Sequence, residues 1–338
     1  MGDLKLSARR LKVAVIGFGK MGMLHAGVLS SLPGVQLTAI CEKNGFIRRF
    51  LKKIFRDTII VDGVKNLSNI GLDAVYVTTP IRSHFPVIES VYENGVAGNL
   101  FVEKTLASSL DEARRICDWA RRFGGVNMVG YVRRFSVTFM RAKSLLDSNI
   151  IGAPASFEAY AYSSDFFGLE KDSRVNAPQV DVVRDLGCYA LDLALWFFGD
   201  LKVKNVRFKS VACNGSIDSV RFSVKTLDNI VGNFSVSWCV NGYRMPEVGF
   251  LIKGSEGNLY MNDDELTLSL KDREARRMLR HDLGDECGFW LGGPEYYRED
   301  EHFIRSVAQG KPAEPCFEAA AKVDCLIDEV LAKADQVE

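Results

Sequence analysis

Three glycines with the spacing Gly17-x-Gly19-x-x-Gly22 follow directly after a run of apolar β-forming residues. In a strand–turn–helix unit that binds a dinucleotide, the first glycine makes the tight turn and the second lets the backbone approach a pyrophosphate. The third lets the helix lie close to the sheet. Glu42 comes twenty residues after Gly22, at the end of the next apolar run, where a carboxylate binds the adenosine ribose. The motif predicts a nicotinamide dinucleotide site, although an ordinary strand–turn–helix shows the same local pattern.

The charges around Glu42 favour NAD over NADP, because a carboxylate at this place repels a 2′-phosphate. Lys43, Arg48 and Arg49 lie close by in the sequence, and a basic side chain that reached the ribose would allow NADP instead. We expect NAD and keep NADP as the alternative. The residues expected to contact the cofactor belong to the glycine turn and to the ends of the following strands: Gly17, Phe18, Gly19, Lys20, Met21, Gly22, Glu42, Lys43, Thr78, Thr79, Pro80, His84, Glu103 and Lys104.

Lys104 is the first candidate catalytic residue. It follows an apolar run in the sequence Glu103-Lys104-Thr105, and Thr78-Thr79-Pro80 follows the preceding run. Open α/β sheets bind ligands outside the carboxyl ends of their strands, so both segments should flank the nicotinamide half of the cofactor. Partial burial lowers the pKa of a lysine there and makes it usable for proton transfer or for polarising a substrate oxygen. The alternative is a solvated lysine at the end of a strand.

The second candidate is the stretch Asp185-Leu-Gly-Cys-Tyr189-Ala-Leu-Asp192. At helical spacing its two carboxylates and its phenol share one face, since residues i, i+4 and i+7 stack. A phenol close to a lysine ammonium group can pass a proton to or from a substrate hydroxyl. In the alternative interpretation, Asp185 caps its own helix and Tyr189 packs in the core.

The candidate site residues must be positioned by regular secondary structure. Short apolar runs alternate with amphipathic segments as far as residue 130. The apolar runs predict strands at Val13–Gly17, Val35–Cys41, Thr58–Val61, Ala74–Thr78, Leu100–Glu103 and Asn127–Val129. The amphipathic segments predict helices at Lys20–Leu32, Phe46–Phe55, His84–Glu93 and Ser109–Phe123. Strands that alternate with helices predict a doubly wound parallel sheet, because parallel strands need crossover helices. We therefore place an α/β domain of the Rossmann type at residues 10–130.

Beyond residue 130 the predicted strands follow one another, with turns at Asn214-Gly215 and Asp228-Asn229. The strands are expected at Ala155–Tyr162, Val203–Cys213, Ser219–Lys225, Ile230–Val240, Val248–Lys253, Asn258–Met261 and Leu266–Leu270. Helices are expected at Thr138–Ser148, Asp185–Phe198, Glu295–Gln309 and Phe317–Lys333. This pattern predicts a C-terminal α+β domain at residues 131–338 with a large, mostly antiparallel sheet. A one-sided sheet leaves an apolar face, so we expect a homodimer or a homotetramer.

Composition narrows the choice of partners. The 43 basic and 43 acidic residues among 338 cancel, so neither nucleic acid nor a membrane surface is an expected partner. No run approaches the roughly 18 apolar residues that a membrane span needs, and residues 1–10 lack the apolar region of a signal peptide. The 8 cysteines form no C-x-x-C pair, which suits reduced thiols in the cytoplasm. The 4 histidines are well separated, so no metal site is expected.

Several motifs in order resemble one family. Gly17-x-Gly19-x-x-Gly22-x-x-His25, Thr79-Pro80-x-x-x-His84, Glu103-Lys104, and Asp185-x-Gly187-x-Tyr189-x-x-Asp192 follow one another along the chain, with Arg133-Arg134-Phe135 between the last two. This series is similar to the glucose–fructose oxidoreductase / inositol dehydrogenase / rhizopine-catabolism family, abbreviated Gfo/Idh/MocA, of NAD(P)-dependent enzymes. The resemblance spans both expected domains.

The resemblance implies hydride transfer between a nicotinamide and a carbinol carbon of a sugar, cyclitol or related polyol. It implies that Lys104 and Tyr189 manage the proton, that Asp185 orients the substrate, and that Arg134 also contacts it. The sequence departs from the family pattern in having Thr105 where a proline usually follows the lysine, and Tyr189 where a histidine is frequent. His25 is expected to pack or to form hydrogen bonds rather than to catalyse.

Two other functions stay open at this point. One is a non-carbohydrate reductase, acting on a trans-dihydrodiol or a biliverdin-like substrate. The other is a catalytically silent protein that senses NAD(P) on the same scaffold; the presence of Lys104, Asp185 and Tyr189 together argues against it.

Overall fold

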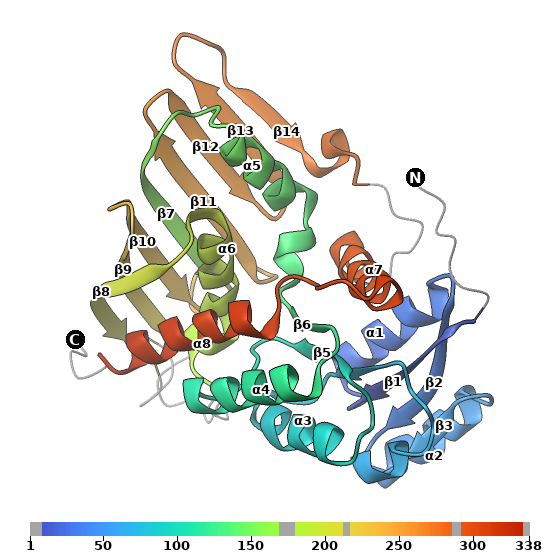
Figure 1. Ribbon diagram of the computed structural model, residues 1–338. Coiled ribbons are helices and arrows are strands. Elements are labelled where there is room, and N and C mark those ends of the chain that lie inside the picture. Colours follow the sequence, from blue (N-terminus) through green and yellow to red (C-terminus); the bar gives the residue numbers. More distant parts are fainter. Residues whose placement is uncertain (1–8, 169–179, 212–216, 286–291, 334–338) are drawn as a thin grey trace. The chain divides into compact units, whose positions relative to one another are not determined.

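The computed structural model describes residues 9–168, 180–211, 217–285 and 292–333, and these form two compact units. One unit comprises Met1–Val132 and Cys287–Asp324, and the other comprises Arg133–Glu286 and Cys325–Glu338. Each unit has its own sheet (Figure 1).

Among the described residues, the first unit holds a six-stranded parallel sheet in the order β3-β2-β1-β4-β5-β6. Its strands are β1 (Leu11–Ile16), β2 (Val35–Cys41), β3 (Ile59–Val61), β4 (Ala74–Val77), β5 (Asn99–Glu103) and β6 (Asn127–Gly130). Its helices are α1 (Lys20–Ser31), α2 (Gly45–Ile54), α3 (His84–Glu93), α4 (Leu110–Phe123) and α7 (Pro294–Gln309). The strand order reverses direction at β1 and β4, which is the doubly wound topology that the sequence predicted.

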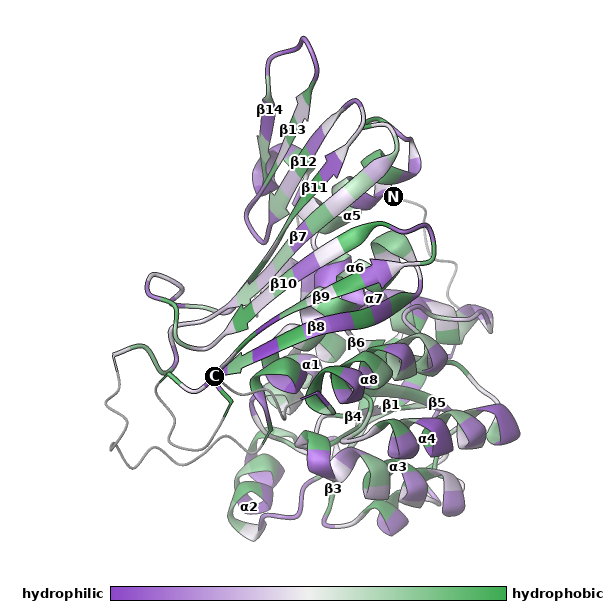
Figure 2. Ribbon diagram, turned by 90° about the vertical axis from the view of Figure 1, so that its left-hand side faces the viewer, coloured by the Kyte–Doolittle hydropathy of each residue, from purple (hydrophilic) through white to green (hydrophobic). Residues whose placement is uncertain are grey.

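Burial explains why these segments form these elements. All four residues of β4 are completely buried, as expected for a parallel strand covered on both faces. Helix α4 buries Ala113, Ile116, Cys117 and Ala120, which recur at helical spacing, and it exposes its arginines. Figure 2 shows the same division along α3 and α4, with hydrophilic and hydrophobic residues on different sides.

The second unit contains, over its described ranges, an eight-stranded sheet in the order β14-β13-β12-β11-β7-β10-β9-β8. Only the pair β7 and β10 is parallel, so the sheet is mixed but mostly antiparallel. The strands are β7 (Pro154–Tyr162), β8 (Leu201–Lys209), β9 (Ser219–Thr226), β10 (Val231–Ser237), β11 (Glu247–Gly254), β12 (Gly257–Asn262), β13 (Glu265–Leu270) and β14 (Arg276–Leu279).

Two helices of the second unit cover one face of this sheet. Helix α5 (Val137–Asp147) packs on β12 and β13, and α6 (Cys188–Phe198) packs on β7 and β11 (Figure 1). Buried and exposed residues alternate along β9 and β10, the pattern of an antiparallel sheet with one covered face (Figure 2). The fold class predicted from the sequence is therefore confirmed for both units.

The predicted extent of the second domain differs from the structure. The boundary at residues 130/131 lies close to the observed division, but Cys287–Asp324 belongs to the first unit rather than to the second. The physical reason is α7, whose Phe303 is completely buried edge-on against the stacked rings of Tyr76 in β4 and Phe101 in β5. Helix α8 (Phe317–Leu331) crosses the division.

Smaller differences concern the strand ends. Strand β8 ends at Lys209, and the expected continuation to Cys213 and the turn Asn214-Gly215 lie mostly outside the described residues. Strand β14 was not predicted, because its charged sequence shows no apolar alternation.

None of the described helices combines the length and the apolar character needed to cross a lipid bilayer.

Candidate cofactor and catalytic site

The glycine turn between β1 and α1 has the close contacts that the sequence predicted. Gly17 has φ +90°, and a Cβ atom there would lie 2.7 Å from the side chain of Thr79. A Cβ atom on Gly22 would lie 2.0 Å from the Gly17 carbonyl oxygen, so α1 rests directly on the turn. By contrast, a Cβ atom on Gly19 would meet nothing within 4 Å. Gly17 and Gly22 are thus required by packing, whereas Gly19 leaves open space beside the turn.

Glu42, at the end of β2, is tied to the same turn. Its Oε2 accepts a hydrogen bond from the Phe18 N–H at 2.8 Å, and its Oε1 accepts one from the Asn44 N–H at 2.7 Å. The side chain is largely buried. Arg48 donates to the carbonyl oxygens of Glu42, at 2.9 Å, and of Lys43. The Arg48 guanidinium group is therefore held by the backbone at the end of β2, and the side chains of Lys20 and Lys43 are exposed.

The end of β4 closes the other side of the turn. The Thr78 hydroxyl donates to the Gly17 carbonyl oxygen at 2.7 Å. The neighbouring Thr79 hydroxyl is shielded from solvent and has no hydrogen-bond partner in the described structure. An unpaired hydroxyl is unusual in a native protein. Together with the open space at Gly19, this hydroxyl fits a dinucleotide bound along the turn, held by the backbone of residues 17–22 and by the ends of β2 and β4.

His84 joins the ends of β4 and β5. Its Nε2 lies 2.8 Å from the Thr79 carbonyl oxygen and its Nδ1 lies 2.8 Å from the Thr105 carbonyl oxygen. The ring is completely buried, and this burial lowers the pKa of His84 although the two carbonyl groups act in the opposite direction. His84 thus holds together the two backbone segments that were predicted to flank the nicotinamide.

Lys104 follows β5 and is half-buried. Its N–H donates to Oε2 of Glu103 at 3.1 Å, and the Lys104–Thr105 peptide bond is cis, although residue 105 is not proline. Oε1 of Glu103 lies 2.9 Å from Nε2 of His25. Both carboxylate oxygens of Glu103 therefore have partners within the first unit.

The helix that was predicted to begin at Asp185 has a different start in the structure. Val183–Gly187 is a π-helical turn, and the α-helix α6 begins only at Cys188. Asp185 lies in the π-turn, whereas Tyr189 and Asp192 lie in α6, so the shared face of the three side chains stays a prediction. Asp185 and Tyr189 are half-buried, whereas Asp192 is completely buried.

Two arginines of the turn Val132–Phe135 contact side chains of α6. Arg134 forms a bidentate ion pair with Asp192, with Nε–Oδ2 at 2.8 Å and the second bond at 2.6 Å. The guanidinium carbon of Arg133 lies 4.3 Å from the centre of the Tyr189 ring, and the same group pairs with Asp263 at 3.1 Å. A cation stacked on the ring fixes its orientation. The predicted substrate contact of Arg134 stays a prediction, since the structure pairs this side chain with Asp192.

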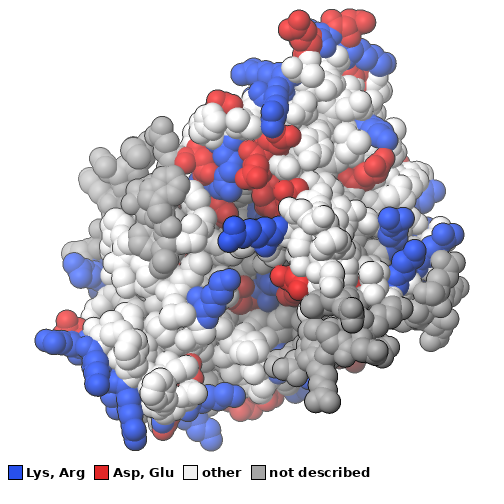
Figure 3. Space-filling view, turned by 180° about the vertical axis from the view of Figure 1, so that it is seen from behind, with Lys and Arg blue, Asp and Glu red and all other residues white. Residues whose placement is uncertain are grey.

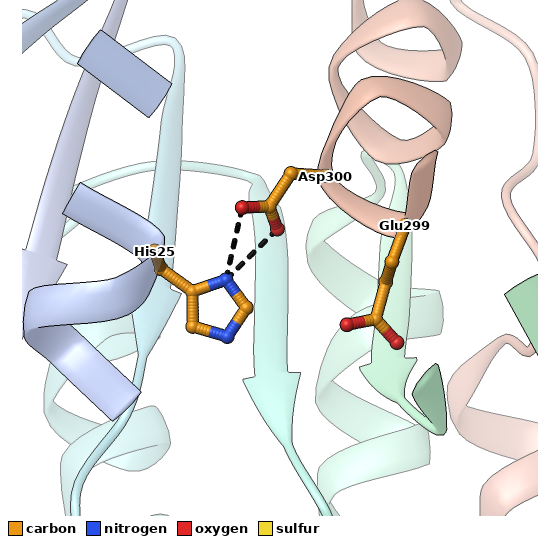
Figure 4. A group of neighbouring side chains, drawn as sticks. All are labelled: His25, Glu299 and Asp300. Carbon is orange, nitrogen blue, oxygen red and sulfur yellow. Dashed lines mark hydrogen bonds and ion pairs between the residues drawn. The ribbon is translucent and has the colours of Figure 1, made fainter. Parts of the chain in front are cut away.

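Sequence reasoning missed an acidic pair on α7, Glu299 and Asp300, which are both completely buried. Asp300 contacts the imidazole of His25 (Figure 4). One signal was available: the apolar residues Phe303 and Ile304 lie three and four positions after Asp300, which places this carboxylate on the buried face of an amphipathic helix.

Comparisons with known proteins cover both units. The family model described as "Oxidoreductase family, NAD-binding Rossmann fold" matches residues 11–131, and the "GFO/IDH/MocA C-terminal domain" model matches residues 139–260. The chain belongs to the Gfo/Idh/MocA family of oxidoreductases. The resemblance inferred from the motifs is thereby confirmed, and the first unit is the NAD-binding Rossmann fold of this family.

Relatives within the Gfo/Idh/MocA family are distant. The scyllo-inositol 2-dehydrogenase (NAD(+)) of Bacillus subtilis is 29% identical over 188 residues, which make up 55% of this chain and 51% of the relative. This chain spans about half the length of that enzyme and of two uncharacterised oxidoreductases from B. subtilis and Escherichia coli. The myo-inositol 2-dehydrogenase of Thermotoga maritima is 23% identical over 89% of this chain and 90% of its own length.

The solved structures of the family show the fold. A levoglucosan dehydrogenase in complex with NADH superposes with a TM-score of 0.85 at 19% identity, over 97% of this chain and 98% of the other. The agreement extends to both units of this Gfo/Idh/MocA protein.

The Gly19→Ala substitution should weaken NAD binding by about tenfold or more without lowering the melting temperature. The added methyl group meets no protein atom, but it occupies the space in which the backbone approaches the pyrophosphate. Calorimetric titration with NAD and a thermal melt of the same sample measure the two effects. Gly63→Ala, at another open glycine outside the turn, is the control. Unchanged NAD affinity in Gly19→Ala would contradict the assigned cofactor position.

Proposed function

We propose that this protein is an NAD-dependent dehydrogenase that moves a hydride between the nicotinamide and a carbinol or ketone carbon of a sugar, cyclitol or related polyol. The observation that supports this best is the place of Lys104. It follows β5 in the same parallel sheet whose first strand leads into the glycine turn, and its backbone is held by Glu103. Ligands bind at this edge of open α/β sheets. Relatives named as inositol and levoglucosan dehydrogenases support a polyol or sugar substrate.

The chain's own residues handle the proton of the reaction. When a CH–OH group becomes a carbonyl, the carbon gives up a hydride and the oxygen gives up a proton; bound NAD supplies the hydride acceptor. Lys104 and Tyr189 accept the proton in oxidation and return it in reduction. Asp185 and Arg134 orient the substrate. The stacking of Arg133 on the Tyr189 ring supports this role, because it holds the phenol in one orientation.

Turnover assays distinguish two other functions from the proposed one. A reductase of a dihydrodiol or biliverdin-like substrate would use the same cofactor but would not oxidise polyols. A silent NAD(P) sensor would bind the cofactor and turn over nothing. Lys104, Asp185 and Tyr189 are all present, which favours an enzyme over a sensor.

Location and assembly follow as further parts of the proposal. The described cysteines are free thiols, which supports a reducing compartment such as the cytoplasm. The sheet face of the second unit opposite α5 and α6 carries a shallow hollow lined by aromatic, polar and charged residues, among them Tyr160, Asn233, Arg207 and Arg221. Charged side chains of both signs lie across the face of the molecule shown in Figure 3. We propose that a second copy covers this hollow.

Polyol turnover should depend on Lys104. A screen of sugars, cyclitols and sugar nucleotides for NAD reduction should find a substrate, and Lys104→Met should lower kcat by about 10²- to 10⁴-fold, the usual contribution of a general acid or base. NAD affinity, measured by calorimetry, should change far less. Lys65→Met, at an exposed lysine, should leave kcat unchanged. Substantial turnover by Lys104→Met would exclude the proposed role of this lysine.

NAD should bind at least tenfold more tightly than NADP. A 2′-phosphate at the ribose would lie against the Glu42 carboxylate, which is fixed in place by two backbone N–H groups. Calorimetry with each cofactor gives the ratio, and Arg48→Gln tests whether the neighbouring guanidinium group contributes. Tenfold tighter NADP binding that disappears in Arg48→Gln would reverse the assignment.

Sedimentation velocity at micromolar concentration should show a dimer or a tetramer. Asn233→Arg, which adds a third arginine to a hollow already lined by Arg207 and Arg221, should shift the protein toward the monomer because burial of a further unpaired charge is costly. Asn66→Arg makes the same exchange at an exposed position of the first unit and should leave assembly intact. A monomeric wild-type protein would disprove self-association.

A further inference from the structure

A buried chain of hydrogen bonds leads from α7 to the backbone of Lys104. Oδ1 and Oδ2 of Asp300 lie 2.9 and 3.0 Å from Nδ1 of His25 (Figure 4). Nε2 of His25 lies 2.9 Å from Oε1 of Glu103, whose other oxygen accepts the Lys104 N–H. His25 and Asp300 are completely buried and belong to the same unit as Lys104. The chain therefore connects a helix distant in the sequence with the residue proposed to move the proton.

Carboxyl groups on both sides of the ring favour a doubly protonated His25; burial raises the pKa of Asp300, and the charge of His25 acts against this shift. An ionised carboxylate only accepts hydrogen bonds, so two carboxylates, one on each ring nitrogen, require both nitrogens to carry a proton. Burial by itself lowers the pKa of His25, but the charges and hydrogen bonds of Asp300 and Glu103 outweigh it and hold the pKa well above its usual value. The imidazolium in turn provides the positive charge between the Asp300 and Glu103 carboxylates.

Other groups surround His25 and Asp300, among them the Tyr76 hydroxyl, whose interaction with Asp300 lowers the pKa of that carboxyl group. The carboxyl group of Glu299 is completely buried, and neither oxygen has a hydrogen-bond partner in the described structure. Burial raises the pKa of Glu299 well above its usual value, and Glu103, Asp300 and Glu295 act in the same direction against the opposing charge of His25. These effects favour the neutral, protonated form of Glu299. The rings of Tyr76, Phe101 and Tyr296 also pack near the imidazole.

A metal ion is the alternative occupant of this cluster. Ligand atoms of His25, Glu299 and Asp300 lie within 4.8 Å of one another. A metal-bound imidazole nitrogen cannot carry a proton. Each ring nitrogen of His25 lies within hydrogen-bond distance of a carboxylate, and when both carboxylates are ionised this geometry favours a proton between His25 and Asp300.

We propose that Asp300 and His25 are positioning residues for Lys104. Asp300 holds His25, His25 fixes one oxygen of Glu103, and the other oxygen of Glu103 fixes the Lys104 backbone. This inference rests on the proposed function, in which Lys104 handles the substrate proton. Small displacements of a group that acts on substrate are costly to the rate, so a buried residue that never touches substrate controls kcat in this arrangement.

Two neighbouring residues of α7 provide a matched pair of variants. Asp300→Asn keeps the shape of the side chain but removes its charge, so His25 becomes neutral at a lower pH and leaves Glu103 as a buried carboxylate without a cation. We expect kcat to fall roughly tenfold at pH 8–9, to recover toward pH 6, and NAD affinity to change little. Glu299→Gln makes the equivalent exchange at a carboxyl group that is already neutral, and it should leave the pH profile of kcat unchanged.

Two measurements do not depend on turnover. Nitrogen-15 NMR of the imidazole rings should show His25 doubly protonated above pH 6.5 in the wild type and in Glu299→Gln, but not in Asp300→Asn. Hydrogen exchange of the Lys104 amide should be faster in Asp300→Asn than in Glu299→Gln. A third measurement uses the wild type alone: the free energy of unfolding as a function of pH. Because the folded-state pKa of His25 is raised, its stabilising contribution is complete below about 6.5 and is lost as the pH rises through the folded-state pKa.

Each outcome separates the possibilities. A wild-type His25 that titrates at or below pH 6.5 overturns the chain, even if Asp300→Asn does not fold. Equal effects of both variants on kcat and on amide exchange reduce Asp300 to a structural residue and also overturn it. A third outcome is a stoichiometric metal ion in the purified protein that a chelator removes, with a loss of Lys104 amide protection. This result would show that a cation, and not a proton, lies between His25 and Asp300, and it would overturn the proposal. If no polyol is turned over while NMR and exchange differ as expected, the proposed function fails and the backbone positioning stands.

Discussion

The close contact between Gly22 and the Gly17 carbonyl group is the constraint on which the first unit depends. Because no side chain lies between them, α1 rests directly on the turn that follows β1. This placement serves two purposes at once. It presents the N-terminal end of α1 and the open space at Gly19 to a dinucleotide, and it carries His25, three residues further along the helix, to the end of β5.

From that position, His25 connects three segments that are distant in the sequence. Glu103 contributes the end of β5, Asp300 contributes α7, and His25 contributes α1. A buried ion pair is weak evidence for stability, because desolvation costs about as much as the charges return. Its value here is the fixed position of the Lys104 backbone. The second unit shows the same principle with Arg134 and Asp192, whose bidentate pair anchors the turn Val132–Phe135 to α6.

The parts of the site that were predictable from the sequence depend on backbone geometry. The spacing of the glycine motif encodes a strand, a turn and a helix. It therefore predicted a helix that begins within Gly17–Gly22, and a next strand with Glu42 at its end. Apolar runs and helical spacing likewise located most strands and helices, since burial of one face is a local property of the pattern. The π-turn Val183–Gly187 was not predictable, because no pattern of side chains distinguishes a π-turn from an α-turn.

The sequence by itself determined the Rossmann topology, the mostly antiparallel second sheet, the family and the glycine turn between β1 and α1. Only the tertiary structure decided that α7 packs with the first unit, that Glu103 uses both carboxylate oxygens within the protein, and that Asp300 faces His25. The reason is physical. Local periodicity records which residues are buried, but a buried charge is paired with whichever partner the folded chain brings to it. His25 and Asp300 are separated by 275 positions, and no local signal encodes that meeting.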